Sequence, residues 1–145
     1  SPHERILNGL ATGSPPILFD DEIRQPSSAG NVAETMVELL ERSNLNGLFH
    51  WAGSEEVSRY ELGLRILERF GFSADRITRA SLKDAPDEIG NRPACLAFEL
   101  NPLAGKLKTR PADLDEQLGD LVVPDHLYEW YRENADDPTR YIARF

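Results

Sequence analysis

Residues 58–71, SRYELGLRILERFG, decide the fold, because this stretch predicts a complete amphipathic helix with both of its ends marked. Ser58 and Glu61 form a capping box, in which the serine hydroxyl accepts from the third helical N–H and the glutamate reaches back. Gly71 supplies the left-handed residue that ends many helices. We therefore expect a helix over residues 59–70 with an apolar side made by Tyr60, Leu64 and Leu67 and widened by Leu62, Ile66 and Phe70.

On both sides of this helix, short apolar segments alternate with further helical patterns. Extended segments are expected at 17–19, 48–52, 77–82 and 95–98, and helices at 4–11, 31–42, 114–121 and 125–134. In the helix over 31–42, apolar residues fall on one face at Val32, Met36, Leu39 and Leu40. This alternation argues for an α/β fold with a small sheet and several helices, too small for a complete doubly wound domain.

The composition fits one acidic globular domain. The 145 residues include 16 basic and 25 acidic side chains and carry a net charge of −9, which disfavours non-specific binding to nucleic acid or an anionic membrane. No apolar run approaches the roughly 20 residues that cross a bilayer. Cys95 is the single cysteine, which predicts a cytoplasmic setting. The first residues read as a helix already under way without an initiator methionine, so we expect a fragment of a longer protein.

The stretch LFDDEIRQP at residues 18–26 is the first candidate for chemistry. Consecutive residues of an extended chain point to opposite sides, so only Asp20 and Glu22 could share a metal ion, and Ca²⁺ or Mg²⁺ needs more oxygen ligands. Paired carboxylates for acid–base catalysis have nothing nearby to fix a substrate. We expect these acids to face water or to pair with nearby cations, at the end of a strand that Pro26 stops.

Other chemistry-bearing residues lack partners in the sequence. His3, His50 and His126 have no metal-ligand spacing, so His50 is interpreted as a partly buried, hydrogen-bonded histidine and Cys95 as a small core residue. Neither glycine-rich phosphate motif occurs, and no tyrosine is followed four positions later by lysine. The chain therefore shows no complete active site, no catalytic or cofactor-binding residue and no metal site.

Two arginines stand out as anion-binding candidates. Arg24 lies where a strand leaves for a loop, and Arg92 precedes Pro93. A guanidinium fork matches a phosphate well, and loops often carry function. The alternative for either arginine is a surface salt bridge. We expect both guanidinium groups to converge on one hollow that holds a diphosphate.

Four stretches, taken in order, resemble the C-terminal, substrate-binding half of an extended, Rossmann-type short-chain dehydrogenase: FDDEIRQPSSAGNVAE, NGLFHWAGSEEVSRYELGLRILERFG, NRPACLAFEL and NPLAGKLKTRPADLDEQL. The families that they resemble are dTDP-4-dehydrorhamnose reductase and its relative, the regulatory β subunit of methionine adenosyltransferase. The HWAG block is especially similar to the β-subunit type. The resemblance covers most of the chain and thins after about Pro124.

This resemblance implies a division of labour. In such enzymes a dinucleotide-binding half, missing here, binds NAD or NADP and supplies a tyrosine–lysine pair, while the C-terminal segments bind a nucleotide-sugar. Arg92 of the arginine-proline motif is the implied substrate contact, and Asp21, Arg24, Gln25 and Pro26 form the loop beside the pocket. The reductases have glycine where Arg24 stands, so a cation there reshapes the pocket or binds an anion.

The resemblance also fixes the expected organisation and functions. Residues 1–135 would form the substrate-binding half, and 136–145 a polar C-terminal tail that packs weakly. The first hypothesis is the substrate side of an NAD(P)-dependent reductase or epimerase acting on a nucleotide-linked sugar. The alternative is a non-catalytic regulatory subunit of the same fold, and a third option is a protein-interaction domain without a small ligand. A homodimer and a partner enzyme both stay open as partners.

Overall fold

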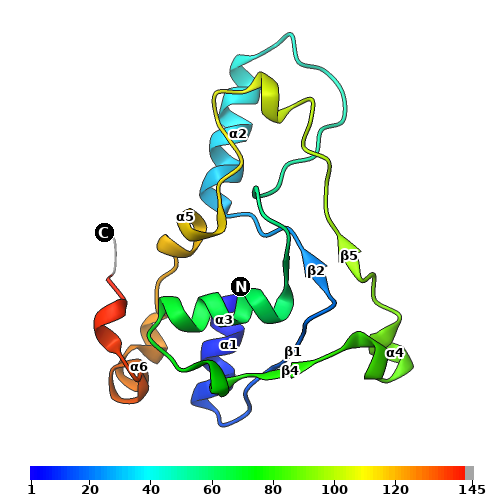
Figure 1. Cartoon of the computed structure of the whole chain (residues 1–145). Helices are drawn as coiled ribbons and strands as arrows, with labels where there is room; N and C mark the ends of the chain where they lie inside the picture. The colour runs from blue at the N-terminus through cyan, green and yellow to red at the C-terminus, as the bar shows by residue number, and fades with distance from the viewer. Residues whose placement is uncertain (143–145) are drawn as a thin grey trace.

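A computed structural model describes residues 1–142 and shows a body from which one arm projects (Figure 1). The body contains α1 (Pro2–Ala11), β1 (Ile17–Phe19), α3 (Arg59–Arg69), β4 (Thr78–Ala80) and α6 (Tyr128–Asn134). The arm contains α2 (Ala29–Glu41) and the 3₁₀ turn η3 (Ala104–Lys106). Between them run β2 (Ile23–Arg24), β5 (Cys95–Leu96) and α5 (Leu114–Gly119). The remaining elements are short: β3 (Val57–Ser58), η1 (Ala74–Arg76), η2 (Leu82–Asp84), α4 (Asp87–Gly90), η4 (Asp125–Leu127) and η5 (Pro138–Arg140). The predicted α/β class is confirmed.

Two small sheets organise the strands. In the first, β1 and β4 are parallel, with Ile17 opposite Thr78. In the second, β2 lies between β3, its antiparallel neighbour, and β5, its parallel neighbour. The pairing of β2 with β5 is closed by the Ile23 N–H, which donates to the Ala94 carbonyl at 2.6 Å. This pairing brings the chain around residue 93 next to Arg24.

The expected strand over residues 48–52 is wrong, because the structure gives this segment no strand. A strand needs a neighbour for its N–H and C=O groups, and none of the strands within residues 1–142 pairs with it. Its first residue, Leu48, is 87 % exposed. The extended segment expected at 95–98 is shortened to β5, and the helix expected over 125–134 is divided into η4 and α6.

Helix α3 lies at the centre of the core, as residues 58–71 predicted. The Ser58 hydroxyl accepts the N–H of Glu61 at 3.0 Å, as predicted, but in the described chain the Glu61 side chain does not make the returning bond of a capping box. At the other end Gly71 has φ +71° and its N–H donates to Glu68, while the N–H of Phe72 donates to Leu67. These two bonds form a Schellman motif. The buried core joins side chains from α1, α3, α5 and α6: Ile6, Leu7, Leu62, Ile66, Leu67, Phe70, Leu114, Leu118 and Tyr131.

An aromatic cluster attaches the last described residues to this core. Tyr131 meets Phe70, Phe72 and Tyr141 edge to face, and burial raises the pKa of its hydroxyl to about 12. The Tyr131 hydroxyl is buried without a hydrogen-bond partner among residues 1–142. The Asp137 N–H donates to the Gly71 carbonyl at 2.8 Å. The expected tail, 136–145, is thus held to the core near its start, and residues 143–145 lie outside the described part.

Helix α2 carries the arm, but it buries polar rather than apolar residues. Thr35 and Glu38 are its buried members, whereas Met36 and Leu40, on its predicted apolar face, are 61 % and 85 % exposed. The Glu38 carboxylate accepts the backbone N–H groups of Thr109 and Lys108 at 2.7 and 2.8 Å. These two hydrogen bonds lower the pKa of Glu38 to about 2. The carboxylate thus holds helix α2 to the segment that contains Lys108 and Thr109.

Candidate functional site

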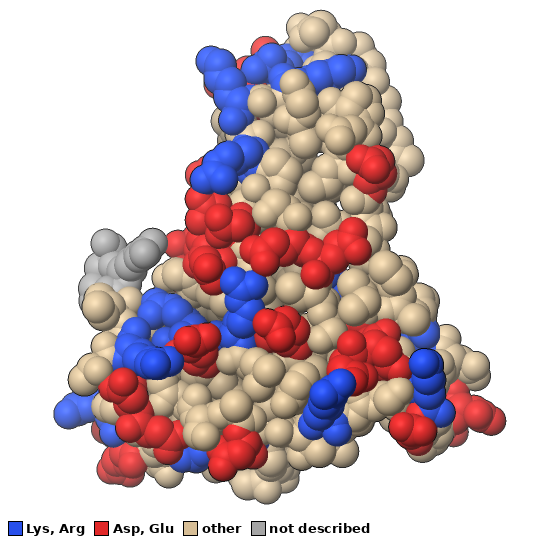
Figure 2. Space-filling view, in the orientation of Figure 1, with Lys and Arg blue, Asp and Glu red and all other residues tan. Residues whose placement is uncertain are grey.

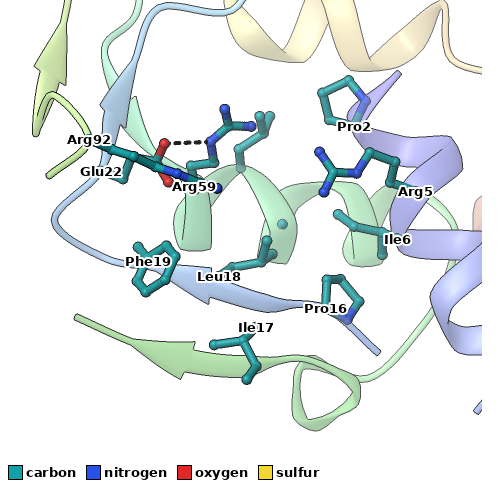
Figure 3. A pocket seen from close by; sticks show the side chains of 12 residues that line it. Pro2, Arg5, Ile6, Pro16, Ile17, Leu18, Phe19, Glu22, Arg59 and Arg92 are labelled. Atoms are coloured by element: carbon teal, nitrogen blue, oxygen red, sulfur yellow. Dashed lines mark ion pairs between the residues drawn. The ribbon is translucent and has the colours of Figure 1, made fainter. Parts of the chain in front are cut away.

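Three arginines from different parts of the chain surround one hollow beside β1 (Figure 3). Arg5 comes from α1, Arg59 is the first residue of α3, and Arg92 lies in the loop between α4 and β5. The hollow has a volume of about 150 Å³, and Glu22 is the carboxylate that lines it. Its apolar lining includes Ile6, Leu18, Phe19 and Leu62. Three guanidinium groups against a single carboxylate make this hollow locally positive in a chain of net charge −9.

Backbone hydrogen bonds position Arg59 and Arg92. Arg59 follows the N-cap Ser58, and its N–H donates to the Glu22 carbonyl at 3.0 Å. The single turn of α4 ends in a bond from the Arg92 N–H to the Ile89 carbonyl at 3.1 Å. Within residues 1–142 the guanidinium groups of Arg5 and Arg92 form no hydrogen bond or ion pair. Both groups are therefore available to an anion.

Glu22 lies at the centre of the charged side of the hollow. Glu22 is only 1 % exposed to solvent. Its Oε1 atom accepts from Arg24 Nη2 at 2.6 Å and lies 3.3 Å from Arg59 Nε. Its Oε2 atom is buried and has no hydrogen-bond partner in the described chain. Of the two expected alternatives, facing water or pairing with nearby cations, Glu22 takes the second, because its buried carboxylate is paired with Arg24 and Arg59.

The two other acids of the stretch also have partners. Asp20 Oδ2 accepts from Arg79 Nε at 2.7 Å, as expected for an acid that pairs with a nearby cation. Asp21 accepts the Leu82 N–H at 2.8 Å and the Ser81 hydroxyl at 2.7 Å, and these bonds lower the pKa of its carboxyl. Asp21 thus fixes the turn η2, and its carboxylate is occupied by protein groups.

The other predicted substrate-loop residues serve as a framework around the hollow. Arg24 donates through Nη1 to the carbonyls of Ile23 at 2.6 Å and Pro93 at 3.1 Å, so its guanidinium holds the loop that carries Arg92. Gln25 joins two segments, donating to the Gly53 carbonyl and accepting the Phe98 N–H, both at 2.8 Å. The Pro26 carbonyl accepts the Gly53 N–H at 3.0 Å.

Of the two predicted arginines, the structure therefore places only the Arg92 side chain in the lining of the hollow. Arg24 does not line the hollow, but it contacts the Glu22 carboxylate, which does, and the Pro93 carbonyl beside Arg92. Sequence reasoning missed Arg5, Arg59 and Glu22. Arg5 and Arg59 belong to no motif, and their approach to Arg92 depends on how α1 and α3 pack. The one signal for Glu22 was its place between a strand end and Arg24.

Two residues expected in the interior are on the surface. His50 is exposed and stacks on Phe98, with ring centroids 4.9 Å apart, because its segment does not enter a sheet. Cys95 is exposed on β5, the edge strand of its sheet, of which both residues are exposed. Between residues 1 and 142, no group of three or more His, Cys, Asp or Glu side chains could hold a metal ion. In the same span, no helix has the length and apolar character needed to cross a membrane.

The charged surface differs from the hollow. Figure 2 shows acidic side chains in a band where the arm joins the body, and a group of basic side chains on the arm. On the body below this band, basic and acidic side chains are intermixed.

The small mixed α/β fold is consistent with the substrate-binding half of a Rossmann-type enzyme. The chain belongs to the family described as RmlD substrate binding domain, whose model matches residues 4–125. It is similar to a probable low-salt glycan biosynthesis reductase, Agl14, of Haloferax volcanii, with 32% identity over 116 residues. That match covers 80% of this chain and 38% of the relative, so the chain spans well under half of the relative's length. No solved structure matches the chain significantly. The resemblance inferred from the four stretches is thereby confirmed.

Proposed function

We propose that this chain is the substrate-binding part of an NAD(P)-dependent reductase or epimerase that acts on a nucleotide-linked sugar, of the dTDP-4-dehydrorhamnose reductase type. Family membership and the reductase relative support this proposal. The observation that carries it is the convergence of Arg5, Arg59 and Arg92 on one hollow. Guanidinium forks bind phosphate oxygens in pairs, which gives both affinity and orientation.

The size of the hollow indicates which part of the ligand it holds. Its 150 Å³ lies below the roughly 300–1,000 Å³ of pockets that enclose drug-sized ligands. The hollow therefore takes the phosphate groups, and the sugar and base extend beyond it. The chain has no glycine-rich turn for a dinucleotide, so its residues do not fit NAD or NADP, and we assign the cofactor to other sequence of the parent protein.

The binding of dTDP-glucose to the chain, measured by isothermal titration calorimetry, tests this proposal. Arg92→Ala removes a charged contact to phosphate, so the Kd should rise roughly 10- to 100-fold, from about 1.5–3 kcal/mol per charged hydrogen bond. Arg110→Ala is the matched control, because Arg110 is an exposed arginine of the arm that pairs with Glu116. Equal losses in both variants, or unchanged binding in Arg92→Ala, would reject the site.

A second candidate is a non-catalytic regulatory subunit of the same fold, like the β subunit of methionine adenosyltransferase. It is favoured by the exposed apolar side chains of Met36, Leu40 and Leu48, which suit a protein partner. Turnover of dTDP- or GDP-4-keto sugars with NAD(P)H by the parent protein would support the first candidate. A copurifying partner enzyme without any turnover would support the second, and self-association alone would indicate a homodimer.

A further inference from the structure

Glu22 is a buried acid beside the three arginines. Its two carboxylate oxygens differ, because one has arginine partners and the other has none. Arg24 and Arg59 both approach Oε1, at 2.6 and 3.3 Å. Oε2 is buried and unpartnered within residues 1–142, although Glu22 lines the hollow. A buried carboxylate oxygen without a donor is unfavourable. This position therefore calls for a hydrogen-bond donor that the described chain does not supply.

We propose that Glu22 Oε2 accepts a hydrogen bond from a hydroxyl group of the ligand whose phosphate Arg5, Arg59 and Arg92 bind. This inference rests on the proposed function and narrows its substrate class. A phosphate diester has no proton to donate and is repelled by a carboxylate, whereas a sugar hydroxyl donates readily. The site thus selects phosphorylated sugars over other phosphate compounds.

Hydrogen bonds around Glu22 fix the position of its carboxylate relative to the arginines that line the hollow. The Glu22 carbonyl accepts the Arg59 N–H at 3.0 Å, which ties the acid to the start of α3. Arg24 bridges the Glu22 carboxylate and the Pro93 carbonyl, so the acid and the Arg92 loop are held by one guanidinium. Figure 3 shows Glu22 between Arg59 and Arg92 at one side of the hollow. A ligand bridging these groups needs its hydroxyl close to its phosphate, as in a sugar 1-phosphate.

The test compares two phosphate monoesters that differ in hydroxyl groups, glucose 1-phosphate and methyl phosphate, by calorimetry on the full chain. The wild-type chain should bind glucose 1-phosphate about tenfold more tightly, as one charge-assisted hydrogen bond allows. Glu22→Gln should reduce this preference to about two- or threefold, because a neutral amide is a weaker acceptor. Arg92→Ala should weaken both ligands by a similar factor.

The outcomes separate the two proposals. If neither ester binds, or Arg92→Ala affects neither, the anion site of the proposed function is rejected. If both bind through Arg92 but Glu22→Gln keeps the tenfold preference, the hydroxyl contact alone is overturned. Tighter binding of both ligands by the same factor in Glu22→Gln also overturns it, because the preference would be unchanged and the carboxylate would act only through its charge.

A ¹³C NMR measurement on the wild-type chain tests the hydroxyl contact without the Glu22→Gln variant, which could misfold. The ¹³C signal of the Glu22 carboxyl carbon should shift on addition of glucose 1-phosphate and stay in place with methyl phosphate at equal saturation. Equal shifts with both ligands would contradict a hydroxyl contact. Urea unfolding of the variant, followed by circular dichroism, shows whether its binding data report on a folded protein.

Discussion

Replacing Arg24 with methionine removes the closest partner of the buried Glu22 carboxylate while keeping an unbranched side chain of similar length. Arg24 Nη2 lies 2.6 Å from Glu22 Oε1, and the two side chains are 19% and 2% exposed. Removing one member of a buried ion pair destabilises a protein by about 3–5 kcal/mol, since the other charge is left without its partner. Arg59 stays near Glu22 at 3.3 Å, so we expect the lower end of this range, about 3 kcal/mol.

Urea unfolding followed by circular dichroism measures this loss as a change in the free energy of unfolding. The matched control is Arg79→Met, because Arg79 pairs with Asp20 with a side chain that is 65% exposed. Such surface pairs contribute about 0–1 kcal/mol. Domains of this size have about 5–15 kcal/mol of stability, so both variants should stay folded.

The double variant Glu22→Met/Arg24→Met separates an ion-pair effect from a packing effect. Replacing both members of a buried pair with apolar residues is often neutral, so the double variant should recover to within about 1 kcal/mol of the wild type. A single Arg24→Met variant no less stable than Arg79→Met would refute the reasoning. So would a double variant at least as unstable as the single one.

Three further predictions concern the stability of the chain. Gly71→Ala should destabilise it by more than the cost of a left-handed alanine, about 1–2 kcal/mol, because the new Cβ would lie 1.9 Å from the Asp137 carbonyl oxygen. Gly13→Ala is the control in the same unfolding assay, because Gly13 has a similar φ but nothing near its Cβ position, so it reports the backbone cost alone. The pKa of Glu38 is lowered to about 2, so the carboxylate stabilises the fold fully above about pH 4.5, and this stabilisation is lost as the pH falls toward 2. As the pH is lowered over this range, the urea midpoint should therefore fall less steeply for Glu38→Gln than for the wild type. Tyr131→Phe removes a buried hydroxyl without a partner in the described chain and should leave stability equal or higher by up to about 1 kcal/mol, and a clear loss would contradict this.

The parts of the fold that could be predicted from sequence are those whose stabilising interactions are local. Helix α3 has its cap, its apolar spacing and its glycine stop within residues 58–71, and the structure confirms the serine half of the cap, the spacing and the stop. The strand expected over 48–52 depends on a neighbour elsewhere in the chain, and its own apolar pattern cannot supply one. Exposure of Leu48 and of Leu40 on α2 has the same origin. Apolar spacing indicates that a surface can be buried, but it does not identify what buries it.

In the candidate site too, the sequence could suggest which side chains matter but could not identify their partners. The arginine-proline motif identified Arg92 without any spatial information. Arg24 was noticed for its charge, yet its guanidinium is occupied by Glu22 and two carbonyls. Three acids in a row look like a solvated surface, but β1 ends at Phe19 and β2 begins at Ile23. The turn between these strands sends each acid to a different partner, which alternation along a single strand does not predict.

The net charge and the hollow lead to compatible conclusions about the ligand. A charge of −9 repels nucleic acid and anionic membranes, whose many phosphates must contact a wide area of protein. Beyond a Debye length of about 8 Å such repulsion is screened at physiological salt, so a small anion at the hollow responds mainly to the groups that line it. Those groups are three guanidiniums and one carboxylate. The net charge thus disfavours polyanions, whereas the lining of the hollow favours a small anion.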